Sequence, residues 1–146
     1  MAISFWEVSI TKGPLEFPNH VFDVHSGAVI DFWGIVRGIE DEREIDGIDY
    51  EVHQPMAEHQ MHLLAERARN EFCLTSLILC HRVGFVPAGE ASLFLRVAAG
   101  HRAAAFSGSQ WLIQELKQKV PIWKRPIFKD KEPAVDKKMS KEVLTV

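Results

Sequence analysis

Several features that mark common classes of protein are scarce or missing in this sequence. It has no run of 18 uncharged apolar residues, so no segment is expected to span a membrane. The opening residues, MAISFWEVSI, lack the basic stretch and apolar run of a secretory signal. Only two cysteines occur, Cys73 and Cys80, and their spacing matches no metal motif. A cytoplasmic protein is therefore expected, with no metal and no cofactor.

The chain also lacks an excess of positive charge. Its 17 Lys and Arg residues are outnumbered by 20 Asp and Glu residues, which gives a formal net charge of −3. A general nucleic-acid binder needs a basic surface to displace counterions, so this class of protein is not expected. Any basic site must be local, and local cations suit a small anion or an acidic partner.

The composition that remains is typical of one ordinary domain, because 146 residues with 47% hydrophobic content can bury a real core. Strands are expected at 3–10, 27–38, 48–53, 74–81 and 91–99, and helices at 18–26, 55–72 and 101–118. The acidic segment 38–47, GIEDEREIDG, is expected to be an exposed loop. Strands and helices alternate imperfectly, which predicts an α+β domain with a mixed or antiparallel sheet and two main helices.

The two main helices are predicted from their apolar faces. After Pro55, apolar residues recur with helical spacing at Ala57, Met61, Leu64, Ala65, Ala68 and Phe72; in the second helix, Ala105, Leu112 and Leu116 face inward. Charged residues and histidines occupy the opposite, solvent-facing side of the first helix, so they are not expected to bind a metal. The catalytic domain is expected to cover 1–125. The Lys-rich tail, 126–146, is either disordered or ordered by a contact, such as one across a dimer.

The segment 115–126, ELKQKVPIWKRP, holds four cations within nine residues. Lysines at the end of a helix suit its dipole, which requires no function. Pro121, however, cannot continue the helix, so the chain must bend between Lys117 and Lys124. The bend could bring both ammonium groups to one pocket walled by Trp123, where burial and clustered charge prepare a lysine for proton transfer.

Three further positions are candidates for a site. His101 and Arg102 stand where a strand gives way to a helix, and the N-terminus of a helix together with an arginine suits an anion. Alternatively, His101 caps the helix and Arg102 is merely exposed. Arg37, where a strand exits into a loop, is either part of a site or an ordinary surface charge. His81 closes an apolar run and is expected to be a hydrogen-bonded core residue.

The length of the second helix limits how these candidates can combine. Arg102 and Lys117 are fifteen residues apart, which is about 22 Å along a continuous helix at 1.5 Å per residue. Their side chains cannot easily close that gap around one small ligand. If both serve one site, they are expected to come from different subunits.

Five motifs occur in order over roughly residues 27–125: FWGIVRG, IDYEVHQPMAE, HRVGFVPAGE, AGHRAAAF and LKQKVPIWK. Together they resemble the large, catalytic subunit of molybdopterin synthase, an enzyme of molybdenum-cofactor biosynthesis. The resemblance implies an α+β fold of the α/β-hammerhead kind. It also implies a homodimer with a small ubiquitin-like sulfur-carrier subunit at each end, which makes a heterotetramer. The implied reaction is sulfur transfer from the thiocarboxylated C-terminal glycine of that subunit to cyclic pyranopterin monophosphate, which forms molybdopterin.

The resemblance also implies roles for individual residues. Lys117 and Lys124 match the family's two functional lysines, and Arg37, His101 and Arg102 match positions associated with binding the anionic pterin. A basic residue in the family's tail reaches the neighbouring subunit's site, and Lys138 or Lys137 is the nearest counterpart. The sequence departs from the pattern at Pro126, where an acidic residue is usual, and at His53, where a tyrosine is common. These departures leave open a degenerate paralogue or an anion-binding module that keeps the fold and partner binding only.

Overall fold

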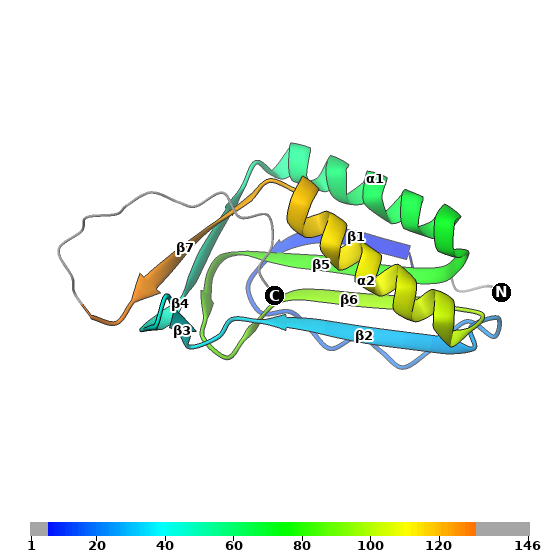
Figure 1. Ribbon diagram of the computed structural model, residues 1–146, viewed down its shortest axis with the longest axis horizontal. Coiled ribbons are helices and arrows are strands. Elements are labelled where there is room, and N and C mark those ends of the chain that lie inside the picture. Colours follow the sequence, from blue (N-terminus) through cyan, green and yellow to red (C-terminus); the bar gives the residue numbers. More distant parts are fainter. Residues whose placement is uncertain (1–5, 131–146) are drawn as a thin grey trace.

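The computed structural model describes residues 6–130, which form one sheet of seven strands and two helices (Figure 1). In chain order the elements are β1 (Trp6–Lys12), β2 (Ala28–Ile35), β3 (Ile39–Glu40), β4 (Arg43–Val52), α1 (Gln54–Phe72), β5 (Leu74–Pro87), β6 (Ala91–Ala99), α2 (Arg102–Lys119) and β7 (Ile122–Phe128). The expectation of an α+β fold with two main helices is confirmed. Among the described residues, no helix is both long enough and apolar enough to cross a membrane.

The sheet is organised around β5, a strand of 14 residues. Its first half lies between β1, which runs parallel to it, and β6, which runs antiparallel. Its last residues pair with β4, which also pairs with β3 and with β7. The sheet is therefore mixed, and β5 links a part covered by helices to a part at its far end that carries β3, β4 and β7 (Figure 1).

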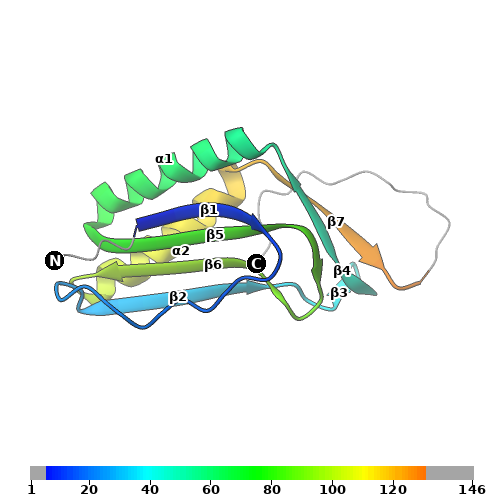
Figure 2. The same cartoon turned by 180° about the vertical axis from the view of Figure 1, so that it is seen from behind.

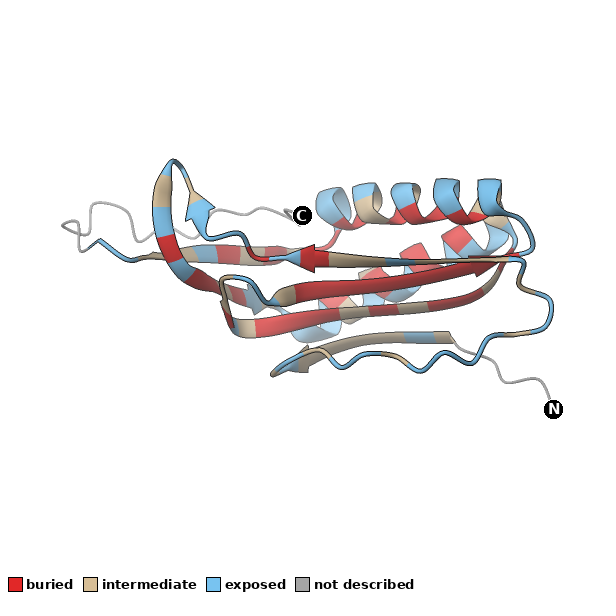
Figure 3. Ribbon diagram, turned by 90° about the horizontal axis from the view of Figure 1, so that it is seen from below, coloured by how far each residue is buried: buried red, intermediate tan, exposed pale blue. Residues whose placement is uncertain are grey.

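Both helices pack on the same face of the sheet. The apolar residues expected to face inward are buried in both, apart from Phe72, which is half-buried. Figure 3 shows the buried residues concentrated on β5, β6 and the inner sides of the helices. Helix α1 ends at Cys73, which takes a left-handed conformation with φ of 53° and donates its backbone N–H to the carbonyl of Arg69.

The other face of the sheet is crossed by an extended segment, 13–27, which we call the strap (Figure 2). The prediction of a helix at 18–26 is wrong, because these residues form no helix. Side chains within the strap accept backbone hydrogen bonds instead, from Val21 to Asn19 and from His25 to Asp23. Such local bonds compete with helix formation. Arg96 of β6 then fixes the strap by donating to the backbone carbonyl of Asn19.

The acidic segment 38–47 is predicted to be an exposed loop. It is exposed at most positions, but the prediction of a loop is wrong. Strands β3 and β4 form a hairpin in which Glu40 pairs with Arg43, and Ile45 is buried in the core. The two residues of the turn, Asp41 and Glu42, both have positive φ, 51° and 61°, as in a type I′ turn. Ile45 and Gly47 are buried in this segment, whereas Ile39 and the two turn residues stay exposed.

Strand β7 forms from residues that include the beginning of the expected tail. It pairs antiparallel with β4 from Ile122 to Phe128, so Pro126 lies within the sheet, opposite Ile48. Phe128 lies under the guanidinium of Arg43, 3.8 Å from its ring centre. The rest of the tail, residues 131–146 with Lys137 and Lys138, lies outside the described residues.

Candidate functional site

Lys124, the third residue of β7, is a buried cation. Its side chain is only 3% exposed, and its Nζ donates to Oε1 of Glu40 at 2.9 Å. An isolated charge is costly to bury, so a buried lysine is stable only when it is paired. The register of β7 places Lys124 opposite Tyr50 of β4, and Glu40 reaches it from the end of β3.

A small hollow of about 130 Å³ opens beside this ion pair. It is lined by Ile35, Val36, Arg37, Glu40, Ile48, Tyr50 and Lys124. Arg37 follows β2; its side chain is 74% exposed and its Nη2 lies 4.0 Å from Oε2 of Glu40. The structure thus brings Arg37 and Lys124 together in one hollow, with the carboxylate of Glu40 between them.

Lys117 lies elsewhere in the single chain. It is exposed near the end of α2 and lines a separate hollow, of about 450 Å³, between α2 and β2. Trp123 does not line the hollow of Lys124, so the prediction that it forms a wall of that pocket is wrong. Side chains alternate between the faces of a strand, and Trp123 lines another hollow with Glu51, Val52 and His53.

His101 and Arg102 are exposed at the start of α2. His101 occupies the N-cap position, but its side chain makes no capping hydrogen bond. Figure 1 shows that the two ends of α2 lie at opposite ends of the helix-covered part of the sheet. Within one chain, these two residues are therefore not brought together with Lys117, as the helix length predicts.

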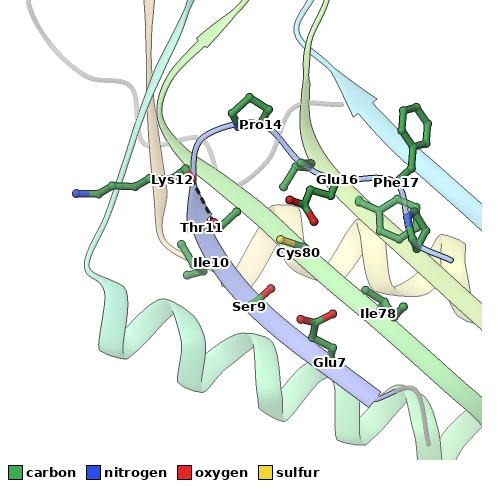
Figure 4. A pocket seen from close by; sticks show the side chains of 13 residues that line it. Glu7, Ser9, Ile10, Thr11, Lys12, Pro14, Glu16, Phe17, Ile78 and Cys80 are labelled. Carbon is green, nitrogen blue, oxygen red and sulfur yellow. Dashed lines mark hydrogen bonds between the residues drawn. The ribbon is translucent and has the colours of Figure 1, made fainter. Parts of the chain in front are cut away.

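A hollow of about 570 Å³ lies between β1 and the strap, and none of the expected site residues lines it. Figure 4 shows the carboxylates of Glu7 and Glu16 beside the thiol of Cys80. Burial raises the pKa of this thiol above its ordinary value, an effect that a hydrogen bond with Ser9 partly offsets. A thiol held in its neutral form is a poor nucleophile, and two carboxylates do not suit an anion.

His81 is fully buried behind the hollow of Lys124, and its ring meets the ring of Tyr50 edge-on at 5.2 Å. Burial lowers the pKa of His81 to about 4, which a weak backbone interaction with Arg82 partly opposes. The expectation of a core residue is confirmed, but within residues 6–130 neither ring nitrogen has a hydrogen-bond partner of good geometry. The described chain also contains no cluster of three His, Cys, Asp or Glu side chains placed to hold a metal.

Sequence reasoning missed Glu40 and Tyr50 as neighbours of Lys124. Glu40 falls in the predicted loop, although Ile39 and Ile45 within that loop are residues that favour strands. Tyr50 lies in an expected strand, but nothing in the sequence indicates that this strand pairs with β7.

Taken together, these features define an α+β protein with a small hollow that holds two cations and one carboxylate. Residues 10–119 match the family model described as MoaE protein. This match covers well over half of the 146 residues, so the chain belongs to the MoaE protein family.

Curated relatives extend the match. A protein of Emericella nidulans named molybdopterin synthase catalytic subunit is 36% identical over 82% of this chain and 62% of its own length. One of the same name from Thermoplasma volcanium is 34% identical over 84% of this chain and 92% of its own. The chain thus spans about three-fifths of the first relative and nearly all of the second.

Solved structures agree with the fold. Molybdopterin synthase from Staphylococcus aureus superimposes with a TM-score of 0.77 at 26% identity, covering 84% of this chain and 91% of that one. A complex of subunits 1 and 2 of molybdopterin-converting factor from Helicobacter pylori gives a TM-score of 0.60 at 24% identity, over 73% and 74% of the two chains. At that identity, the second comparison speaks for the fold alone.

Proposed function

We propose that this chain is the catalytic subunit of a molybdopterin synthase. It transfers sulfur from the thiocarboxylated C-terminus of a small ubiquitin-like subunit to cyclic pyranopterin monophosphate, and so forms molybdopterin. The observation that carries this proposal is membership of the MoaE protein family, in a chain that places Arg37 and Lys124 in one hollow. The names of the two curated relatives support it.

The charges of the reactants agree with the charges of the site. The pterin carries a cyclic phosphate, and the carrier subunit carries a thiocarboxylate, so both reactants are anions. The protein has a formal net charge of −3, so the binding of these anions depends on local cations rather than on the overall charge. Arginine suits phosphate because its planar guanidinium can donate two parallel hydrogen bonds.

The two lysines have different environments, and we assign them different roles. Lys117 is exposed, so it can reach a tail that enters from a partner protein. There it polarises the thiocarboxylate carbonyl or moves a proton during attack on it. Lys124 is buried and fixed, which suits a cation that holds the pterin and stabilises the charge that develops on it.

The complete site combines two copies of the chain. His101 and Arg102 lie at the opposite end of α2 from Lys117, so they act in the site of the second subunit of a homodimer. Lys138 in the tail is assigned by resemblance to the neighbouring subunit's site as well. A monomer in solution that kept full activity would contradict this arrangement. The two cysteines are both free thiols, which supports a cytoplasmic location.

The proposal is tested by substituting Lys117 with alanine. The variant is mixed with a thiocarboxylated small subunit and the precursor pterin, and dithiolene product is measured. Lys117→Ala abolishes sulfur transfer while the complex with the small subunit remains intact on size-exclusion chromatography. Lys119→Ala, two residues away and paired with Glu115 at 3.1 Å, is the control and retains turnover.

The same assay on the unmodified chain distinguishes the proposed enzyme from a degenerate paralogue. Pro126, in place of the acidic residue usual at this position, is the reason to consider such a paralogue. A paralogue would bind the small subunit without forming dithiolene. An anion-binding module without catalysis would instead prefer another anion, such as a nucleotide, to the pterin in a binding screen.

A further inference from the structure

We propose that Glu40 is a positioning residue for sulfur transfer: its carboxylate holds the ammonium group of Lys124 at a fixed place in the hollow. This inference rests on the function proposed above. Glu40 does not itself touch the reacting atoms, and it acts through Lys124.

The first support is the contact itself. The Nζ of Lys124 lies 2.9 Å from Oε1 of Glu40, and the two side chains are 3% and 17% exposed. A lysine has four rotatable side-chain bonds, and its ammonium is usually mobile in water. Here burial restricts the chain of methylenes, and the carboxylate fixes its charged end. Without Glu40, the buried ammonium would lose this counter-charge and this hydrogen-bond acceptor, and it would be held less firmly in place.

The second support is how the backbone places Glu40. It is the last residue of β3, directly before the turn of Asp41 and Glu42, and its register opposite Arg43 is set by the hairpin. Both turn residues hold positive φ, which costs energy for any residue other than glycine. Strain of this kind persists where the surrounding structure requires it, often beside a functional site.

The third support is that Glu40 binds its two neighbouring cations unequally. Arg37 approaches Oε2 only to 4.0 Å and is 74% exposed, whereas Lys124 is hydrogen-bonded and buried. An anion that enters the hollow can therefore draw Arg37 toward itself while Lys124 stays in place. Glu40 thus leaves Lys124 fixed and Arg37 free to move. In this arrangement Arg37 captures the substrate and Lys124 aligns it.

A neighbouring pair shows what an ordinary ion pair on these strands looks like. Arg125 and Asp49, on β7 and β4, lie 3.1 Å apart, but their side chains are 47% and 35% exposed. Exposed pairs of this kind contribute little to stability. Asp49→Asn therefore removes a cross-strand ion pair from the same two strands without reaching the hollow, and it serves as the matched control.

The test compares Glu40→Gln, Glu40→Asp and Asp49→Asn in the synthase assay with the thiocarboxylated small subunit and the precursor pterin. Glu40→Gln keeps the size of the side chain but loses the charge. A loss of positioning lowers kcat by about 10-fold or more and leaves KM for the pterin within about 2-fold. Glu40→Asp keeps the charge with a shorter reach and recovers part of kcat, and Asp49→Asn matches the original protein.

Thermal unfolding of each variant separates positioning from folding. If Glu40→Gln does not fold, Glu40→Asp decides: a lower kcat with unchanged KM supports the proposal, and an unaltered kcat overturns it. The proposal is also overturned if Glu40→Gln turns over normally, if it changes only KM, or if Asp49→Asn loses as much kcat. If the unmodified protein forms no dithiolene, the proposed function itself is overturned. This outcome is measured on the unmodified protein alone, so it is distinguishable from a failure of the proposal for Glu40.

Discussion

Arg96 and Asp31 form a two-pronged ion pair that links β6 to β2, with Nε–Oδ1 and Nη2–Oδ2 distances of 2.6 and 2.8 Å. The third nitrogen, Nη1, donates to the backbone carbonyl of Asn19 at 2.7 Å. The ring of Phe22 lies against the same guanidinium, 5.1 Å from its centre. One buried arginine therefore joins two strands to the strap, and it uses the fork of donors that no other side chain has.

The first prediction concerns this arginine. Arg96→Lys keeps the charge but cannot make both the two-pronged bond to Asp31 and the bond to Asn19. The free energy of unfolding is expected to fall by about 2–4 kcal/mol, as for other disrupted buried ion pairs. Amide hydrogen exchange in the strap should rise more than exchange in α1. Arg67→Lys, at an exposed pair with Glu71, is the control; unchanged exchange in the strap of Arg96→Lys would show that other contacts hold it.

The second prediction concerns Gly27, whose backbone N–H donates to the carbonyl of Ala99. A Cβ at this position would overlap the carbonyl oxygen of Gly100. Gly27→Ala must therefore shift the backbone at the start of α2, and the expected loss of stability is about 1–3 kcal/mol, typical of overpacking. Gly38→Ala is the matched control, because a Cβ there meets no atom within 4 Å. Equal melting temperatures for the two variants would contradict the predicted clash.

The third prediction concerns the turn of the β3–β4 hairpin. Asn-Gly is the preferred pair for a turn with positive φ at both residues. The double variant Asp41→Asn with Glu42→Gly is expected to raise the free energy of unfolding by about 1 kcal/mol, because it relieves backbone strain. Denaturant titration measures the change. Glu42→Ala retains the strain and is the control; a gain of the same size in that variant would point to charge removal instead.

The fourth prediction concerns pH. The pKa of His81 is about 4 in the folded protein, against 6.5 for a free imidazole. Between these values the unfolded chain binds a proton that the folded chain does not, so stability rises with pH through this window. It is complete above about pH 6.5, and about 3 kcal/mol is lost on acidification to pH 4.

Denaturant titrations across this pH range test the assignment to His81. His81→Leu removes the titrating group, so the dependence of stability on pH between 4 and 6.5 should become flatter. His62→Gln, at an exposed position on α1, is the control and should leave the dependence unchanged. An equally steep dependence in His81→Leu would assign the effect to other groups.

The sequence predicts those parts of the fold that depend on local periodicity. Helix α1 follows from apolar residues at helical spacing, and β5 and β6 from long apolar runs, because burial on one or both faces leaves a regular trace in the sequence. It does not predict which strands pair. The placement of Glu40 beside Lys124 depends on β4 pairing with both β3 and β7, and 84 positions separate the two residues.

The candidate residues were predicted unevenly for the same reason. Arg37 and Lys124 were selected as separate cations, and their meeting in one hollow is a product of the sheet. Lys117 and Lys124 are close in sequence, yet they line different hollows of the single chain. Proximity along the chain does not indicate Glu40 as a neighbour of Lys124, because Glu40 lies in a distant segment whose acidic composition resembles a loop.

The pairing of β1 with β5 also has a consequence for the order of events during synthesis. Trp6 of β1 aligns with Leu77 of β5, and within residues 6–130 the strand that pairs with β2 is β6. The first two described strands therefore cannot pair until much of the chain has been synthesised, whereas the backbone hydrogen bonds of α1 join residues only four positions apart. At a usual rate of roughly 5–20 residues per second, that delay lasts several seconds. During that time the unpaired backbone edges of β1 and β2 are open to binding by chaperones.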